Sequence, residues 1–124
     1  MKICITSQGN NLDAEIDPRF GRASYFLIVD KDREGNEIIQ NPYIQAGGGA
    51  GIQAAQFIAN KDVEVGITGN IGPNAFQVLR EAGLSVISGV SGGVRTAVER
   101  YNRGELEPVE NPTVNEKFGM SPGK

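Results

Sequence analysis

The sequence of 124 residues contains no histidine, no tryptophan and a single cysteine, Cys4. Without an imidazole there can be no Ser-His-Asp triad, no Cys-His dyad and no HExxH zinc site. A single cysteine also excludes an intrachain disulfide, a CxxC motif and a four-thiolate metal site. Any bound metal would therefore have to use carboxylates, one thiolate, backbone groups or contacts outside its coordination sphere.

Positive charge is scarce as well, with 12 lysines and arginines against 15 aspartates and glutamates and a formal net charge of −3. We therefore expect no general affinity for nucleic acid or for anionic membranes. No run of about 18 apolar residues is present, and the N-terminus lacks the charged and then apolar layout of a signal peptide. A cytoplasmic protein is expected, and the length suits a single domain.

Short runs of β-branched and aromatic residues predict five strands, and helical spacing of apolar residues predicts three helices. Turn residues at 32–36 predict an antiparallel hairpin between the second and third strands. From residue 42 onward, helices and strands alternate. The predicted strands are 2–6, 24–30, 37–40, 63–68 and 84–88, and the predicted helices are 52–60, 73–82 and 94–103.

This order of elements predicts an α/β fold with a five-stranded mixed sheet. The hairpin makes the second strand antiparallel to the first and third, and right-handed helical crossovers make the third, fourth and fifth strands parallel. The predicted strand order is 3-2-1-4-5. Ligands of open α/β sheets bind at the carboxyl edge where the strand order reverses, which here lies between the first and fourth strands.

Glycine is abundant, and most of it falls in the loops at that edge. Eleven of the 17 glycines lie in four loops, residues 7–22, 46–51, 68–74 and 89–93. Three of these loops lead into helix N-termini, where free N–H groups and the helix dipole favour anions. Glycine lets a ligand approach such a backbone closely, but short turns also need glycine for left-handed conformations. Anion binding and a purely structural use both remain open.

The motifs of nucleotide and nucleic-acid enzymes are incomplete. Residues 49–54 match the G-x-G-x-x-G/A pattern, but the next strand ends at 67–70 without the acidic residue that would bind a ribose. No GK[ST] follows a glycine loop, and the middle of the first strand lacks the aspartate of a two-metal nuclease. Because imidazole bases and convincing carboxylate pairs are missing, we predict that the protein is not an enzyme.

Four polar or nucleophilic residues have more than one interpretation. Cys4 stands between two isoleucines and is predicted to be a small buried hydrophobe, since a ligand or redox role would need exposure and a lowered pKa that no adjacent residue supplies. Arg22 could pair with an anionic ligand at the carboxyl edge or with a loop carboxylate such as Asp17. The amides of Asn70 and Asn74 could bind a ligand or cap the helix that starts near Pro73, and capping is the more frequent use.

Six ordered blocks of sequence carry a resemblance to a known family. They are MKICITSQG at the N-terminus, Phe20-Gly21-Arg22 before SYFLIVD, Asn41-Pro42, GGGAGIQAAQFIA, residues 67–76 (ITGNIGPNAF) and residues 101–106 (YNRGEL). Over residues 1–107 the chain resembles the dinitrogenase iron-molybdenum cofactor biosynthesis family, which includes NifX, NafY, the C-terminal domain of NifB and the orange protein. The resemblance implies a ribonuclease H-like α/β domain over residues 1–107. We expect residues 108–124 to form a flexible tail.

For function, the resemblance implies non-enzymatic binding, carriage or scaffolding of an anionic iron-sulfur or molybdenum-sulfur species. It also implies partner proteins that donate or accept the cluster, and we expect a monomer or weak dimer. Many relatives carry a histidine in the glycine loop where this chain has Gly48, so imidazole ligation is excluded here. The alternative function is a cofactor-free regulatory or protein-interaction module that uses the acidic tail.

What remains is an outer-sphere site in which backbone N–H groups and one arginine hold the anion. No side chain would ligate the metal directly. The residues predicted to bind the cofactor are Arg22, Gly47, Gly48, Gly49, Gly51, Asn70, Gly72 and Asn74.

Overall fold

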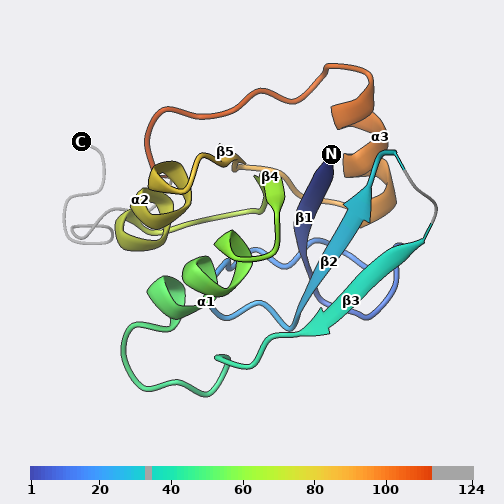
Figure 1. The fold of residues 1–124 in the computed structure, drawn as a ribbon. Helices are drawn as coiled ribbons and strands as arrows, with labels where there is room; N and C mark the ends of the chain where they lie inside the picture. The colour runs from blue at the N-terminus through green and yellow to red at the C-terminus, as the bar shows by residue number, and fades with distance from the viewer. Residues whose placement is uncertain (33–34, 113–124) are drawn as a thin grey trace, which may run out of the picture.

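The computed structural model describes residues 1–32 and 35–112, which form a mixed sheet with helices on both sides (Figure 1). The elements follow the predicted order, and the predicted hairpin turn lies partly outside the described residues. The strands are β1 (Lys2–Ser7), β2 (Tyr25–Asp30), β3 (Asn36–Gln40), β4 (Val63–Ile67) and β5 (Ser85–Ile87), and the helices are α1 (Ala50–Ala59), α2 (Pro73–Glu81) and α3 (Val94–Asn102).

The strand order within the described residues is β3-β2-β1-β4-β5, which confirms the predicted topology. Strand β2 runs antiparallel to both β1 and β3, whereas β4 runs parallel to β1 and β5. Strands β1, β3, β4 and β5 therefore point the same way, and the loops that follow them meet at one edge. This is the arrangement of the ribonuclease H-like fold.

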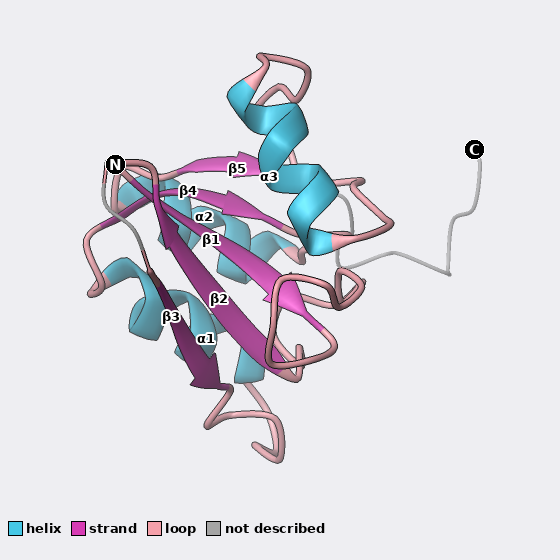
Figure 2. Ribbon diagram, turned by 90° about the vertical axis from the view of Figure 1, so that its right-hand side faces the viewer, coloured by secondary structure: helices cyan, strands magenta, loops and turns pink. Residues whose placement is uncertain are grey.

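Alternation along the strands sends side chains to two separate cores, as the two-residue period of a β-strand requires. Cys4, Phe26 and Ile28 belong to the core under helices α1 and α2, while Ile3 and Ile5 belong to the core under α3. Figure 2 shows α1 and α2 on one face of the sheet and α3 on the other. The two helices that precede and follow β4 thus lie side by side on the same face.

Element ends differ slightly from prediction. Helix α1 begins at Ala50, two residues before the predicted start, because Gly51 adopts a helical conformation within the first turn. Strand β5 spans only Ser85–Ile87, so the first and last residues of the predicted 84–88 segment lie outside the strand.

The segment after α3 crosses the outer edge of β5 and contacts both cores. Leu106 packs against the core under α3, and Val109 packs against the core under α1 and α2. The Val109 N–H donates to the Val86 carbonyl oxygen at 2.8 Å. Val109 belongs to the predicted tail of residues 108–124 but packs against the domain, and residues 113–124 of that tail lie outside the described residues.

None of the helices in residues 1–32 and 35–112 is long and apolar enough to cross a membrane.

Candidate functional site

A pocket of about 460 Å³ opens where the loops after β1, β3 and β4 converge. Its lining comes from three segments, residues 19–22, 49–52 and 70–75. The second segment contains the start of α1 and the third contains the start of α2. The pocket therefore lies at the carboxyl edge beside β1 and β4, the part of the sheet for which the topology predicts a ligand site.

Both helices that face the pocket begin without side-chain caps. Gly49, in the left-handed conformation with φ of 75°, caps α1, and Gly72, in an extended conformation, caps α2. Neither cap residue makes a side-chain hydrogen bond, and neither first turn contains an acidic residue. The prediction that Asn70 or Asn74 caps helix α2 is wrong, because Gly72 occupies the cap position and glycine has no side chain to accept the bond. The first-turn N–H groups of both helices are therefore left to other acceptors.

The two first turns are in contact. A β-carbon at Gly51 would lie 3.5 Å from the Ala75 Cβ atom, which is ordinary van der Waals distance. At Gly21, by contrast, a β-carbon would lie only 2.7 Å from the Gly51 Cα atom and 2.9 Å from its backbone nitrogen. Only glycine at position 21 lets this loop pack onto the start of α1. Two positive helix ends are thus brought together beside one loop.

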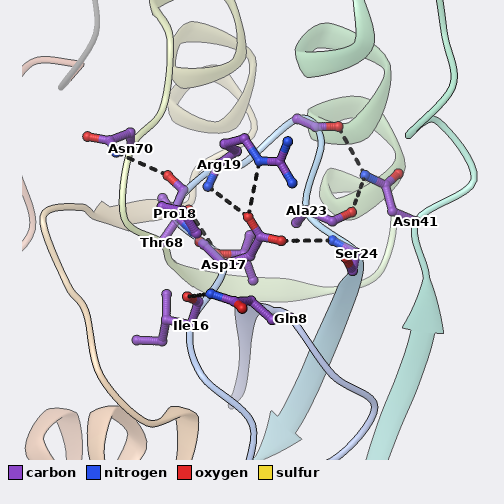
Figure 3. Close-up of polar contacts among 12 residues, drawn as sticks. Gln8, Ile16, Asp17, Pro18, Arg19, Ala23, Ser24, Asn41, Thr68 and Asn70 are labelled. Atoms are coloured by element: carbon purple, nitrogen blue, oxygen red, sulfur yellow. Dashed lines mark hydrogen bonds and ion pairs between the residues drawn. The ribbon is translucent and has the colours of Figure 1, made fainter.

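Asp17 and Asn41, two buried polar residues, hold that loop in place (Figure 3). The Asp17 carboxylate accepts the backbone N–H groups of Arg19 at 3.0 Å and Ser24 at 3.1 Å. The Asn41 side chain donates to the carbonyl oxygens of Gly21 at 3.0 Å and Ala23 at 2.9 Å. The pocket wall at residues 19–22 is therefore fixed from below by polar contacts that are themselves shielded from water.

The loop is also joined to the segment that starts α2. The Asn70 N–H and side-chain Nδ2 both donate to the Pro18 carbonyl oxygen, at 2.7 and 3.2 Å, and the Phe20 N–H donates to the Asn70 carbonyl at 3.1 Å. Beside them, a β-carbon at Gly69 would lie 2.7 Å from the Pro18 Cα atom. Asn70 thus positions the pocket wall with its amide nitrogen, and its side-chain oxygen faces away from Pro18 (Figure 3).

Arg22 contacts backbone carbonyls. Its guanidinium donates to the carbonyl oxygens of Ile44 at 2.8 Å, Ala46 at 3.0 Å and Gly47 at 3.1 Å. The carboxylate of Asp17 is instead paired with Arg19, whose Nε lies 3.5 Å from Oδ1. Arg22 therefore fixes the glycine loop before α1 while also lining the pocket.

Arg19 is a pocket residue that is not among the predicted binding residues. This residue lines the pocket and its side chain is 62% exposed. Its position in the sequence could have indicated this role, because Arg19 lies in the glycine-containing loop after β1, three residues before Arg22. The described lining holds two arginines and no carboxylate, in a chain whose net charge is −3.

Most of the predicted binding residues meet at this pocket. Those that line it are Arg22, Gly49, Gly51, Asn70, Gly72 and Asn74. Gly47 and Gly48 are exposed in the loop before α1 and are not among the described residues of the lining. Arg22 nevertheless ties this loop to the pocket through the Gly47 carbonyl.

No cluster of three or more potential metal-ligating side chains occurs in the described part of the chain. Cys4, the one cysteine, is only 2% exposed. Burial raises the pKa of the Cys4 thiol far above its ordinary value, and the charge of Glu37 raises it further. The prediction that Cys4 is a small buried hydrophobe is confirmed, and its sulfur is held as a neutral thiol away from the pocket. Chemically, the site offers N–H groups and guanidinium charge to an anion.

Over residues 1–104, the sequence matches the family described as dinitrogenase iron-molybdenum cofactor. An uncharacterized protein of Methanocaldococcus jannaschii is 32% identical over 113 residues, which are 89% of this chain and 92% of that protein. The apo form of the orange protein from Desulfovibrio gigas is similar in structure, with a TM-score of 0.87 and 39% identity over 90% of this chain and 95% of that one. A putative NifB protein from Thermotoga gives a TM-score of 0.76 and 34% identity over 86% of this chain and 91% of its own.

Proposed function

The chain belongs to the dinitrogenase iron-molybdenum cofactor family, and on that basis we propose that it binds and carries an anionic metal-sulfur species. The cargo is an iron-molybdenum cofactor precursor or a molybdenum-sulfur cluster, received from one cluster-handling protein in the cytoplasm and passed to another. The similarity to the orange protein and to a putative NifB protein supports this class of cargo. The residues proposed to surround it are the pocket residues at the starts of α1 and α2.

The observation that carries the proposal is the electrostatic contrast between the pocket and the whole chain. The lining combines two uncapped helix N-termini with Arg19 and Arg22 and contains no carboxylate among the described residues. Each helix start contributes roughly half a positive charge, and its N–H groups point outward along the helix axis. Asp17, buried beneath the loop, offsets part of the Arg19 charge, and the helix starts and Arg22 add to the positive side of the balance. A chain of net charge −3 therefore concentrates hydrogen-bond donors and cationic groups at this pocket, which favours an anion.

The volume of the pocket favours a multi-atom anion. About 460 Å³ is some fifteen times the roughly 30 Å³ that one water molecule occupies in the liquid. A single small oxyanion would leave most of this space to water. A sulfide-bridged cluster would fill more of it and would also contact the apolar parts of the lining, such as Ile52 and Ala75.

We propose carriage rather than catalysis because the described lining has no side chain that exchanges a proton near neutral pH. Arginine stays charged and asparagine does not titrate, so neither supplies a general acid or base. Carriage requires only that the anion be held and released. Hydrogen bonds from backbone N–H groups do this without covalent bonds to the metal.

A titration with tetrathiomolybdate, with and without copper, tests the proposal. We expect saturable shifts of backbone amide resonances within residues 46–75, strongest at Gly51, Ile52, Asn74 and Ala75. Molybdate, of the same charge and shape but with oxygen in place of sulfur, serves as the matched control ligand and should bind more weakly. Absence of shifts in residues 46–75 at millimolar tetrathiomolybdate would refute the proposed function.

A further inference from the structure

We propose that Arg19 supplies the side-chain charge that contacts the anion, and that Arg22 is a positioning residue that shapes the glycine loop. This assignment rests on the proposed function of the pocket. The two arginines lie three residues apart in one loop and both line the pocket, so the sequence does not distinguish them. The hydrogen bonds of the two side chains distinguish them.

The Arg22 guanidinium is already engaged with the protein. Its two terminal nitrogens donate to three carbonyl oxygens, of Ile44, Ala46 and Gly47, at 2.8 to 3.1 Å. These carbonyls belong to the chain that leads into α1. An anion that drew Arg22 toward itself would have to break these bonds and leave the carbonyls without their donors, which costs free energy. Arg22 is therefore suited to holding the loop and poorly suited to capturing cargo.

The far end of the Arg19 guanidinium has no hydrogen-bond partner among residues 1–32 and 35–112. Only Nε, the nitrogen nearest the backbone, pairs with Asp17, at 3.5 Å. The described residues accept no other hydrogen bond from this side chain, and in Figure 3 its terminal nitrogens extend past Asp17. With 62% of the side chain exposed at the pocket, those nitrogens can present two parallel N–H donors to an anion.

Asp17 restrains the Arg19 side chain through its Nε atom alone. The Asp17 carboxylate is 2% exposed and is fixed by the backbone N–H groups of Arg19 and Ser24. The ion pair therefore tethers the base of the Arg19 side chain to a rigid point. Less rotamer freedom is lost when an anion binds, because part of the side chain is already ordered.

Arg95 offers a matched control for Arg19. Its side chain is 54% exposed and its Nε pairs with Asp13 at 3.1 Å, but it lies on α3, on the opposite face of the sheet from α1 and α2. Exposed ion pairs of this kind contribute little to stability. If Arg19 were only a surface ion pair, Arg19→Gln and Arg95→Gln would behave alike.

The experiment compares tetrathiomolybdate affinity in the wild type, Arg19→Gln, Arg19→Lys, Arg22→Gln and Arg95→Gln over a range of salt concentrations. We expect Arg19→Gln to weaken binding at least tenfold and to flatten the dependence of log Kd on log salt, because one cationic contact is lost. Arg19→Lys should recover part of the affinity. Arg95→Gln should match the wild type, and Arg22→Gln should mainly lower Tm and speed amide exchange in residues 44–47.

Two results overturn the assignment. One is an Arg19→Gln variant with the affinity and salt dependence of Arg95→Gln while the wild type binds. The other is a folded Arg22→Gln variant that loses more affinity than Arg19→Gln. If the wild type does not bind tetrathiomolybdate at all, the proposed function fails and the assignment of Arg19 fails with it.

Discussion

At the scale of single residues, the path of the pocket wall depends on side chains that are buried beneath it. Asp17 and Asn41 direct their polar atoms at the backbone of residues 19–24, so the loop is held without using the groups that face the pocket. Asn41 reaches Gly21 and Ala23 from about 20 residues along the chain. These contacts leave the exposed end of Arg19 and the first-turn N–H groups available to a ligand.

Replacing Gly21 with alanine should damage the pocket, because a β-carbon there would lie 2.7 Å from the Gly51 Cα atom. We expect a loss of about 1–3 kcal/mol in the free energy of unfolding and weaker tetrathiomolybdate binding, since the loop must move away from α1. Gly47→Ala is the control, because a β-carbon at Gly47 would meet nothing within 4 Å. Urea unfolding and ligand titration of both variants measure the difference. Equal effects at the two positions would contradict the packing argument.

Cys4 should be unreactive in the folded protein, because burial raises its pKa above the ordinary value of 9.0. The folded thiol stays protonated where the unfolded thiol ionises, so this group reduces stability as pH rises above about 9, by up to about 1.4 kcal/mol per pH unit. Thiol labelling should therefore require unfolding. The stability of the wild type should also fall more steeply above pH 9 than that of Cys4→Ala. Rapid labelling at neutral pH without denaturant would show that the sulfur is accessible.

At the scale of secondary-structure elements, the pocket results from two helices that start at the same edge of the sheet and on the same face. Helix α1 follows β3 and helix α2 follows β4, and these two strands point the same way, so both helices start at the carboxyl edge of the sheet. The first turns lie so close that a β-carbon at Gly51 would make ordinary van der Waals contact with the Ala75 Cβ atom. The segment after α3 has a different role, since it covers the exposed side of β5.

Two truncations test the contribution of the C-terminal segment, residues 105–124. Removing residues 105–124 deletes Leu106 and Val109, which are partly buried against the two cores, and should cost about 2–4 kcal/mol of stability. Removing only residues 113–124 should leave tetrathiomolybdate affinity unchanged, because the proposed site lies within residues 19–75. Thermal unfolding and titration of the two truncations provide the test. Loss of ligand binding in the shorter truncation would instead point to a binding role for the tail.

At the scale of the whole molecule, sequence patterns predict the architecture well because each strand and helix carries its own signal. Two-residue alternation marks the strands, the turn residues near 32–36 indicate a hairpin, and helical segments between strands require parallel crossovers. Glycines in the loops at the carboxyl edge then locate the region of the pocket. Each of these patterns is local in the sequence, and the strand order is enough to assemble them into the fold and to place the pocket.

The different hydrogen-bond partners of Arg19 and Arg22 are not predictable from such local patterns. Arg19 and Arg22 occupy the same loop, and their different partners depend on the path of the backbone at residues 44–47 and on the burial of Asp17. The cap of α2 was also mispredicted, since nearby asparagines suggested a side-chain cap where the backbone places Gly72. Such contacts depend on distances of a few tenths of an ångström between segments far apart in sequence.

Charge distribution is the property of the whole molecule that links the fold to the proposed cargo. The chain has a net negative charge, yet its carboxyl-edge pocket has only cationic side chains among the described charged residues of its lining. Nonspecific attraction of anions to the surface is therefore expected to be weak, and we expect binding only where the two helix dipoles converge. A carrier benefits from this arrangement, because cargo is held at one position and can be released intact.

Binding of a metal-sulfur anion at the carboxyl-edge pocket is tested most directly by mapping the backbone amides of the wild-type protein during titration with tetrathiomolybdate in the absence of oxygen. We expect saturable shifts of the amide resonances of residues 50–52 and 74–75, at the starts of α1 and α2, and little change in residues 105–112, which lie across β5. Shifts that are absent at millimolar ligand, or that centre outside residues 46–75, would contradict the proposed site.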